Sequence, residues 1–134
     1  MKAKNLLAIA VLIAAVSGVS HAKDDQFADI DCSKDQDSTL GMKVCAAKEL
    51  DKTKQALKAK RAEMLKKVGK EQRKAANSYI KASDAYATAL CSFEDEAYHG
   101  GTIQSLVHGM CLDGEYQRQI KVIDEYMNRP EGSL

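Results

Sequence analysis

Apolar residues recur every three or four positions along three long stretches of the chain, which is the spacing of one face of an α-helix. Almost no stretch alternates between apolar and polar residues as a half-buried strand does, and the only proline is Pro130. The pattern therefore predicts an all-α domain with three helical segments. We expect the apolar stripes of these segments to meet in a core rather than to line a ligand groove.

The first helix is predicted to begin at Ser38 or Thr39 and to end near Gly69. A short hydroxyl side chain can accept a hydrogen bond from the free N–H groups of a first helical turn. Glycine tolerates the left-handed conformation that often ends a helix, so Gly69 is expected to act as a stop or a hinge. The apolar stripe between these ends consists of Val44, Ala47, Leu50, Leu57, Met64, Leu65 and Val68.

The second helix is predicted over about residues 71–96, and a Gly-Gly pair at residues 100–101 breaks the pattern after it. Its expected core stripe consists of Ala76, Tyr79, Ala82, Tyr86, Leu90 and Phe93. Thr102 can cap a third segment, in which Gly109 and Gly114 predict a weak middle that bends or splits. The third stripe consists of Ile103, Leu106, Val107, Met110, Tyr116, Ile120, Ile123 and Met127.

Residues 1–22 have the three parts of a secretion signal. Lys2 and Lys4 give it a positive start. Residues 6–16 form an apolar run that is too short to span a bilayer. Residues 20–22 offer a cleavage site with small residues at its first and last positions. We therefore expect this segment to be removed on export.

Residues 23–134 are then expected to form a single domain in the periplasm or outside the cell. No second apolar run of membrane length follows, so no membrane span is expected after cleavage. The domain is predicted to begin with an acidic arm at residues 23–37. All four cysteines lie in the expected mature chain: Cys32, Cys45, Cys91 and Cys111.

An even number of cysteines in a small exported chain predicts two disulfides. Four cysteines allow three connectivities, and we prefer Cys32–Cys45 with Cys91–Cys111. The first bond would pin the acidic arm to the start of the first helix, and the second would join the second helix to the third. If the first two helices form an antiparallel hairpin that turns near Gly69, Cys45–Cys91 with Cys32–Cys111 is the alternative.

Charge is nearly balanced overall but unevenly distributed. The chain has 20 basic and 19 acidic residues, and without Lys2 and Lys4 the net charge is −1. This balance excludes a strong general attraction to nucleic acid or to anionic membranes. Locally the net charge is −4 over residues 23–42, +8 over residues 43–74 and −6 over residues 84–134. Either these helix faces attract one another within the domain, or one charged face docks an oppositely charged partner.

The chain has no residue pattern typical of a catalytic site. His108 and Cys111 have the spacing of a metal-site fragment, but zinc needs three or four convergent ligands and Cys111 is expected to be in a disulfide. The carboxylates of residues 94–96 point in different directions on a helix and cannot converge on one substrate atom. We expect no enzyme activity, no metal and no cofactor.

Two runs around the cysteines resemble the lysozyme inhibitor LprI-like N-terminal domain family. The first run is Asp31-Cys32, twelve residues, then Cys45-Ala46-Ala47-x-x-Leu50 followed by Leu57. The second run is Leu90-Cys91-Ser92-Phe93-Glu94, then Gly100-Gly101-Thr102-Ile103, then Cys111-Leu112 and Arg118. The resemblance covers roughly residues 31–127.

The chain departs from the family pattern at several positions. The family usually has a tryptophan and an arginine shortly before its third cysteine, whereas residues 83–87 keep only the tyrosine, Tyr86. The usual aspartate and asparagine after the second cysteine correspond to Lys54 and Lys58. The change affects either binding or core packing, depending on which of these the missing side chains serve.

The resemblance implies a small helical exported bacterial protein that binds lysozyme and protects the cell wall. Together with the acidic third part of the chain, it suggests inhibition by occlusion. The expected contact residues are Glu94, Asp95, Glu96, Tyr98 and His99, because they occupy a loop next to a disulfide. The alternative is a non-inhibitory envelope module that binds another exported protein or an anionic wall polymer through the basic first helix.

Overall fold

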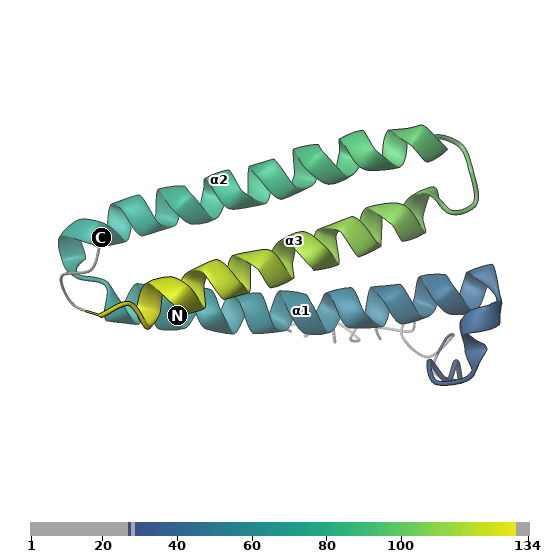
Figure 1. The fold of residues 1–134 in the computed structure, drawn as a ribbon, viewed down its shortest axis with the longest axis horizontal. Helices are drawn as coiled ribbons and strands as arrows, with labels where there is room; N and C mark the ends of the chain where they lie inside the picture. The colour runs from purple at the N-terminus through teal and green to yellow at the C-terminus, as the bar shows by residue number, and fades with distance from the viewer. Residues whose placement is uncertain (1–26, 28, 131–134) are drawn as a thin grey trace, which may run out of the picture.

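Three long helices make up most of the computed structural model, which describes residue 27 and residues 29–130 (Figure 1). The elements are η2 at Asp35–Asp37, α1 at Thr39–Lys67, α2 at Lys70–Asp95, η3 at Glu96–Tyr98 and α3 at Gln104–Met127. No strand occurs in this part of the chain, so the all-α prediction with three helices is confirmed. The predicted secretion signal lies outside the described residues. None of the helices in the described part combines the length and hydropathy that a bilayer span requires.

α3 is the helix on which the other two pack. The chain reverses at Gly69 and again after Tyr98, so α1 and α3 run in the same direction and α2 runs against them (Figure 1). Contact is most extensive between α1 and α3, and α2 also packs on α3, whereas α1 and α2 hardly touch. The fold is therefore not a hairpin of the first two helices with a third added, because α3 connects them.

The helix boundaries follow local chemistry. Ser38 is the N-cap of α1, and its Oγ accepts a hydrogen bond from the N–H of Gly41 at 2.9 Å, as a capping serine should. α1 ends at Lys67, and Val68 and Gly69 are extended. Gly69 is the N-cap of α2 with φ −62°, so the left-handed stop expected there is not formed.

The core lies at the end of the bundle where α1 turns into α2. Its buried residues are Leu57, Met64, Val68, Ile123 and Met127, and Ala76, Ile80, Tyr116 and Ile120 pack against them. The predicted stripes of the first and third helices supply seven of these nine residues. Burial of such side chains is the main stabilising contribution of a helix pair.

The predicted core stripe of α2 is wrong for most of its residues. Tyr86 and Phe93 are 54% and 78% exposed, and Tyr79 is 37% exposed. The buried face of α2 instead carries small residues, with Ala87 and Cys91 fully buried. Because Cys91 is bonded to Cys111 of α3, the disulfide fixes which side of α2 faces α3. A covalent constraint therefore sets the rotation of this helix, although another face is more apolar.

α3 continues without a break through both glycines, contrary to the predicted weak middle. A Cβ on Gly109 would lie 4.0 Å from the Leu50 side chain, so this glycine packs directly on α1. A Cβ on Gly114 would meet no atom within 4 Å. Tertiary contacts along both sides of α3 offset the poor helix propensity of the two glycines.

Gly41 offers a test of how closely the N-terminal turn packs on α1. A Cβ there would lie 1.6 Å from the carbonyl oxygen of Asp35, so any side chain must push the turn away. Gly41→Ala should lower the free energy of unfolding by about 1–3 kcal/mol, although alanine favours helix. Urea denaturation followed by circular dichroism measures the change.

The matched control is Gly114→Ala in α3, where the new methyl group meets nothing. It should leave stability unchanged or raise it by up to about 1 kcal/mol. Equal free energies of unfolding for Gly41→Ala and Gly114→Ala would contradict the close contact between Asp35 and α1.

Candidate docking site at the stapled end of the bundle

Two disulfides hold the end of the bundle opposite the core. Cys91 and Cys111 join α2 to α3 with a Cα–Cα distance of 5.5 Å, across 20 residues. Cys32 and Cys45 join the N-terminal segment to α1 with the same Cα–Cα distance, across 13 residues. These are the two preferred pairs, and the alternative pairing of Cys45 with Cys91 is not formed. No cysteine in the described residues is free.

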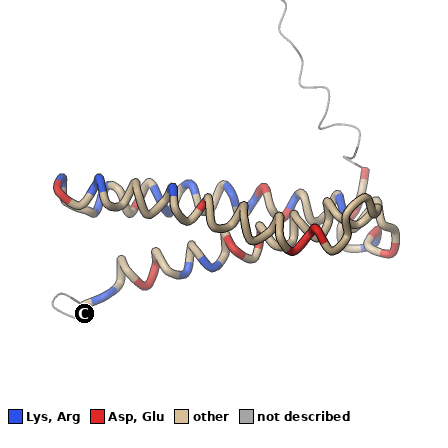
Figure 2. Tube along the Cα trace, turned by 90° about the horizontal axis from the view of Figure 1, so that it is seen from above, with Lys and Arg blue, Asp and Glu red and all other residues tan. Residues whose placement is uncertain are grey.

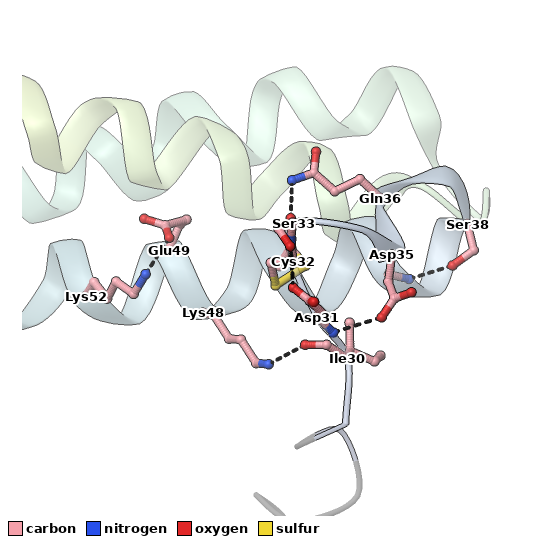
Figure 3. The surroundings of a disulfide bond; sticks show 12 residues. Ile30, Asp31, Cys32, Ser33, Asp35, Gln36, Ser38, Lys48, Glu49 and Lys52 are labelled. Carbon is pink, nitrogen blue, oxygen red and sulfur yellow. Dashed lines mark hydrogen bonds and ion pairs between the residues drawn. A yellow bond between two sulfur atoms is a disulfide. The ribbon is translucent and has the colours of Figure 1, made fainter.

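The N-terminal segment is held on α1 by more than its disulfide (Figure 3). Lys48 Nζ donates a hydrogen bond to the carbonyl of Ile30 at 3.0 Å, and Asp31 N–H donates to a carboxylate oxygen of Asp35 at 2.8 Å. Hydrogen bonds from Ser33, followed by the ion pair with Lys34, hold the pKa of Asp31 below its ordinary value. This part of the acidic arm is therefore an ordered cap over the start of α1.

Residues 94–103, which comprise the last two residues of α2 and the connection to α3, are tied to the bundle by Asp95. Its carboxylate is buried and accepts a hydrogen bond from Gln104 Nε2 at 3.1 Å. Its other oxygen lies 2.5 Å from His108 Nδ1 on α3. Gln104 also accepts a hydrogen bond from the N–H of Gly100, so one side chain links both parts of the loop. We call residues 94–103 the stapled loop.

Steric constraints explain why two glycines occur in the stapled loop. Gly100 has φ +72°, a left-handed conformation that side chains rarely adopt. A Cβ on Gly101 would lie 3.0 Å from the carbonyl oxygen of Tyr98, to which the Gly101 N–H donates a hydrogen bond at 2.8 Å. The Gly-Gly pair therefore lets the chain turn tightly between η3 and α3.

Four of the five expected contact residues are exposed in the stapled loop. Glu94, Glu96, Tyr98 and His99 all face solvent, and His99 Nδ1 lies 3.6 Å from the Glu96 carboxylate. Asp95 differs, because it is buried and its oxygens are taken by Gln104 and His108. Asp95 therefore positions the loop and does not present a charge on the surface.

Phe93 is a surface residue that the sequence pattern assigned to the core. It directly precedes the exposed acids of the stapled loop and is the most exposed large apolar residue in the described chain, at 78%. An exposed aromatic residue beside charged groups is typical of a protein-binding surface. The fixed position of Cys91, two residues earlier, is the signal that could have placed Phe93 on the outside.

Lowering the pH should weaken the contacts of Asp95 with Gln104 and His108. The hydrogen bond from Gln104, and then the hydrogen bond and charge of His108, hold the pKa of Asp95 below its ordinary value of 3.8. A carboxyl group whose pKa is lower in the folded than in the unfolded state stabilises the fold. This contribution is fully present above the unfolded-state pKa and is lost as pH falls through the folded-state pKa. The stability difference between wild type and Asp95→Asn should therefore be largest above pH 3.8 and shrink below it.

Urea denaturation of both proteins at a series of pH values measures this difference. Glu94→Gln is the control, because the exposed neighbour should leave the wild-type profile unchanged. A constant difference between wild type and Asp95→Asn at every pH would contradict the assignment.

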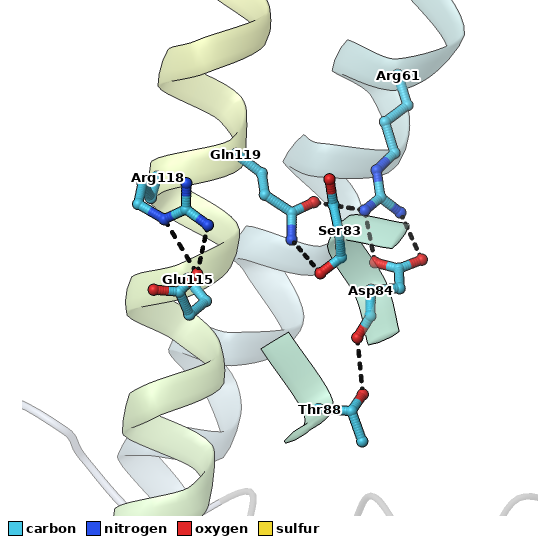
Figure 4. A network of polar contacts seen from close by, with 7 residues as sticks. All are labelled: Arg61, Ser83, Asp84, Thr88, Glu115, Arg118 and Gln119. Carbon is cyan, nitrogen blue, oxygen red and sulfur yellow. Dashed lines mark hydrogen bonds and ion pairs between the residues drawn. The ribbon is translucent and has the colours of Figure 1, made fainter. Parts of the chain in front are cut away.

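A polar network ties the middles of the three helices together (Figure 4). Arg61 of α1 donates two hydrogen bonds to the carboxylate of Asp84 on α2, at 3.1 and 2.5 Å. The same guanidinium donates to Gln119 Oε1 on α3 at 2.6 Å, and Gln119 Nε2 donates to the carbonyl of Ser83. Gln119 is almost completely buried, so this network fixes the three helices relative to one another.

Sequence reasoning missed Gln119, although a signal was present. It lies three residues after Tyr116 and four before Ile123, on the same face of the third helix as the apolar stripe. A polar residue within an apolar stripe needs a buried partner. Arg61, with its rigid set of donors, is the partner that can satisfy both Gln119 and Asp84.

The basic residues of α1 and early α2 are only partly neutralised within the chain. Lys60 pairs with Asp124 of α3 at 2.8 Å, and this contact raises the Lys60 pKa above its ordinary value. Arg61 pairs with Asp84. Lys58 and Lys66 are exposed and make no ion pair with any described residue. Figure 2 shows Lys and Arg distributed along the helices. Intramolecular attraction thus accounts for part of the charge pattern, and a basic surface remains.

The described residues include an open apolar groove, and no cluster of metal-ligating side chains is found among them. No group of three His, Cys, Asp or Glu side chains in residue 27 or residues 29–130 is arranged to hold a metal ion. An open apolar groove of about 400 Å³ lies at the core end between α2 and α3, and Tyr79 and Tyr126 line it.

Comparison with known proteins agrees with the resemblance seen in the cysteine pattern. The family model described as lysozyme inhibitor LprI matches residues 31–122. The matched segment contains both disulfides, α1, α2, the stapled loop and most of α3. No curated protein and no solved structure gives a significant match.

Proposed function

This chain belongs to the LprI lysozyme inhibitor family, and from that premise we propose that it binds a lysozyme and inhibits it by covering part of its surface. The family is one of inhibitors rather than enzymes, and family membership over residues 31–122 is the observation that carries the proposal. The described part of the chain exposes charged and aromatic side chains next to a disulfide, which supports occlusion as the mechanism.

We place the contact at the exposed residues of the stapled loop. Glu94, Glu96, Tyr98 and His99 are each exposed to solvent, and Phe93, next to Glu94 in the chain, adds exposed apolar surface. The Cys91–Cys111 disulfide and the contacts of the buried Asp95 keep this loop ordered in the unbound protein. A loop that is already ordered loses less conformational entropy on binding, so more of the contact energy appears as affinity.

Charge supports a basic partner. Animal-type lysozymes are basic proteins, and the exposed carboxylates of Glu94 and Glu96 would attract them. Such attraction raises the association rate and weakens as salt screens it. We therefore propose that the inhibitor meets lysozyme in the periplasm or outside the cell, where its two disulfides are stable.

A muramidase assay with purified protein at low and high salt tests the proposed function. We expect inhibition at micromolar concentrations of this protein, with a higher inhibition constant at high salt. The proposal fails if no type of lysozyme is inhibited at micromolar protein.

A second candidate function rests on the basic surface. Lys58 and Lys66 on α1 are exposed without an ion pair among the described residues, and could bind an anionic wall polymer or an acidic exported protein. Pull-down from envelope extract with wild type and with Lys58→Glu/Lys66→Glu tests this candidate. The variant should recover none of the partners that wild type binds. If the variant still binds them, the basic residues of α1 only contact solvent and do not form a binding site.

A further inference from the structure

One face of α2 is apolar along most of the helix and remains exposed. Its residues, which we call the α2 seam, are Ala75, Tyr79, Ala82, Tyr86, Ala89 and Phe93. All six are exposed to solvent, although Tyr79, Ala82, Tyr86 and Phe93 belong to the stripe that the sequence pattern assigned to the core. An apolar helix face of this length is normally buried against another element.

The spacing of the α2 seam is that of a helix made to pack against a second helix. Its members are separated by alternating steps of four and three residues, the heptad spacing of a coiled coil. The residues that flank the seam on both sides are small or apolar: Ala76, Ser78, Ser83, Ala85, Leu90 and Ser92. Ala76, Ser83 and Leu90 are half-buried, whereas Ser78, Ala85 and Ser92 are exposed, and the absence of charge on this exposed flank would let another backbone approach closely.

The alternation of residue size makes the seam complementary to itself. Large rings at Tyr79, Tyr86 and Phe93 alternate with alanines along the seam. In an antiparallel pair of α2 helices related by a two-fold axis, Tyr86 of one copy lies opposite Ala82 of the other. The same register places Tyr79 opposite Ala89, so each ring fills the space beside an alanine. A parallel pair would instead oppose ring to ring and alanine to alanine.

Charge along α2 favours the same orientation. The first five residues of the helix carry three basic side chains, Lys70, Arg73 and Lys74, against the single acid Glu71, and the exposed acids Glu94 and Glu96 follow the seam at its other end. An antiparallel pair brings the basic end of each copy beside the acidic end of the other, whereas a parallel pair opposes like charges.

One ring of the seam is already held in position. The Arg118 guanidinium lies 5.6 Å from the centre of the Tyr86 ring, and Arg118 is itself fixed by hydrogen bonds to Glu115 (Figure 4). This contact limits the freedom that Tyr86 would lose on association.

We propose that two copies of this protein associate through their α2 seams as an antiparallel, two-fold symmetric pair. This inference goes beyond the proposed function and does not depend on lysozyme binding.

Sedimentation velocity of the purified protein, from micromolar to millimolar concentration, tests the association. Wild type is expected to form a dimer in this range. Ala82→Glu places a carboxylate in the seam of each copy and should raise the dissociation constant by about 100-fold or more, because both charges would be buried without a partner. Since Ala82 is exposed in the single chain, the variant should keep its helical circular dichroism.

The matched control is Ala59→Glu, which puts the same charge on an exposed alanine of α1 away from the seam. It should dimerise as wild type does. A wild type that stays monomeric at all concentrations would overturn the proposal, as would equal dimerisation of Ala82→Glu and Ala59→Glu.

Cross-linking of lysines to carboxylates in a mixture of ¹⁴N and ¹⁵N protein tests the orientation. Lys74 and Glu94 lie about 30 Å apart along one α2 helix, because each helical residue rises about 1.5 Å, so they cannot be linked within one copy. The antiparallel pair predicts mixed-isotope links between Lys74 and Glu94 or Glu96. Mixed links only between like ends, such as Lys74 with Glu71, would overturn the antiparallel arrangement.

Discussion

Removing the Cys91–Cys111 disulfide should destabilise the domain by about 3 kcal/mol or more. The bond closes a segment of 20 residues, and a loop of that size restricts the unfolded chain by about 3 kcal/mol in the chain-entropy model. Cys91 is also fully buried, so its replacement removes packing between α2 and α3. A small domain has a free energy of unfolding of only about 5–15 kcal/mol, so this loss leaves little reserve.

Urea denaturation of Cys91→Ala/Cys111→Ala measures the effect, and Cys32→Ala/Cys45→Ala is the matched comparison. The second bond closes a shorter segment of 13 residues and lies nearer the surface, so its removal should cost less. A larger loss in the Cys32–Cys45 variant would mean that the N-terminal cap contributes more to stability than the α2–α3 connection does.

The second large effect is expected at the polar network between the helices. Arg61→Met keeps an unbranched apolar stem but leaves Gln119 Oε1 without its donor in an almost fully buried position. An unsatisfied buried polar group costs about 1–3 kcal/mol. We expect a loss near the upper end of this range, because Asp84 loses its two hydrogen bonds at the same time.

The network interpretation also predicts non-additivity. Gln119→Leu alone should destabilise the protein, but the double variant Arg61→Met/Gln119→Leu should cost less than the sum of the single changes, because no unpaired amide remains. Lys60→Met is the control, since it breaks a more exposed ion pair with Asp124 and should cost less than Arg61→Met. Additive effects of Arg61→Met and Gln119→Leu would contradict a coupled network.

Helix number and disulfide pairing could be predicted because they depend on local spacing and compartment. Apolar periodicity marked the three helices, and the short separations of Cys32–Cys45 and Cys91–Cys111 favoured the pairs that the structure has. Ser38 could be placed as a cap because one side chain and one N–H suffice for the interaction. These features need no knowledge of the tertiary arrangement.

The face of α2 could not be predicted from its own residues. Periodicity identifies the most apolar side of a helix, which here carries Tyr79, Tyr86 and Phe93, but it does not say which protein covers that side. The Cys91 bond to α3 turns the small Ala87 face inward, and the aromatic side is left for other contacts. The most apolar stripe and the buried stripe are therefore different faces of the same helix.

The docking segment remains a prediction, and the exposure of its individual residues could not be predicted from the sequence. Residues 94–99 were recognised by charge and by their position beside a cysteine. Burial of Asp95 depends on Gln104 and His108, which approach it only after α3 folds back along α2. The sequence alone cannot distinguish which of several consecutive acidic residues is buried, because the partners of the buried one come from another helix.

The stapled loop and the basic face of α1 make opposite predictions for lysozyme binding, and one comparison distinguishes them. The dissociation constant for an animal-type lysozyme should be measured by calorimetry for wild type, Glu94→Gln/Glu96→Gln/Tyr98→Ala and Lys58→Gln/Lys66→Gln. We expect at least about a tenfold weakening in the loop variant, equivalent to about 1.4 kcal/mol, and wild-type affinity in the α1 variant. Wild-type affinity in the loop variant, with binding lost in the α1 variant, would contradict the assignment of the docking site to the stapled loop.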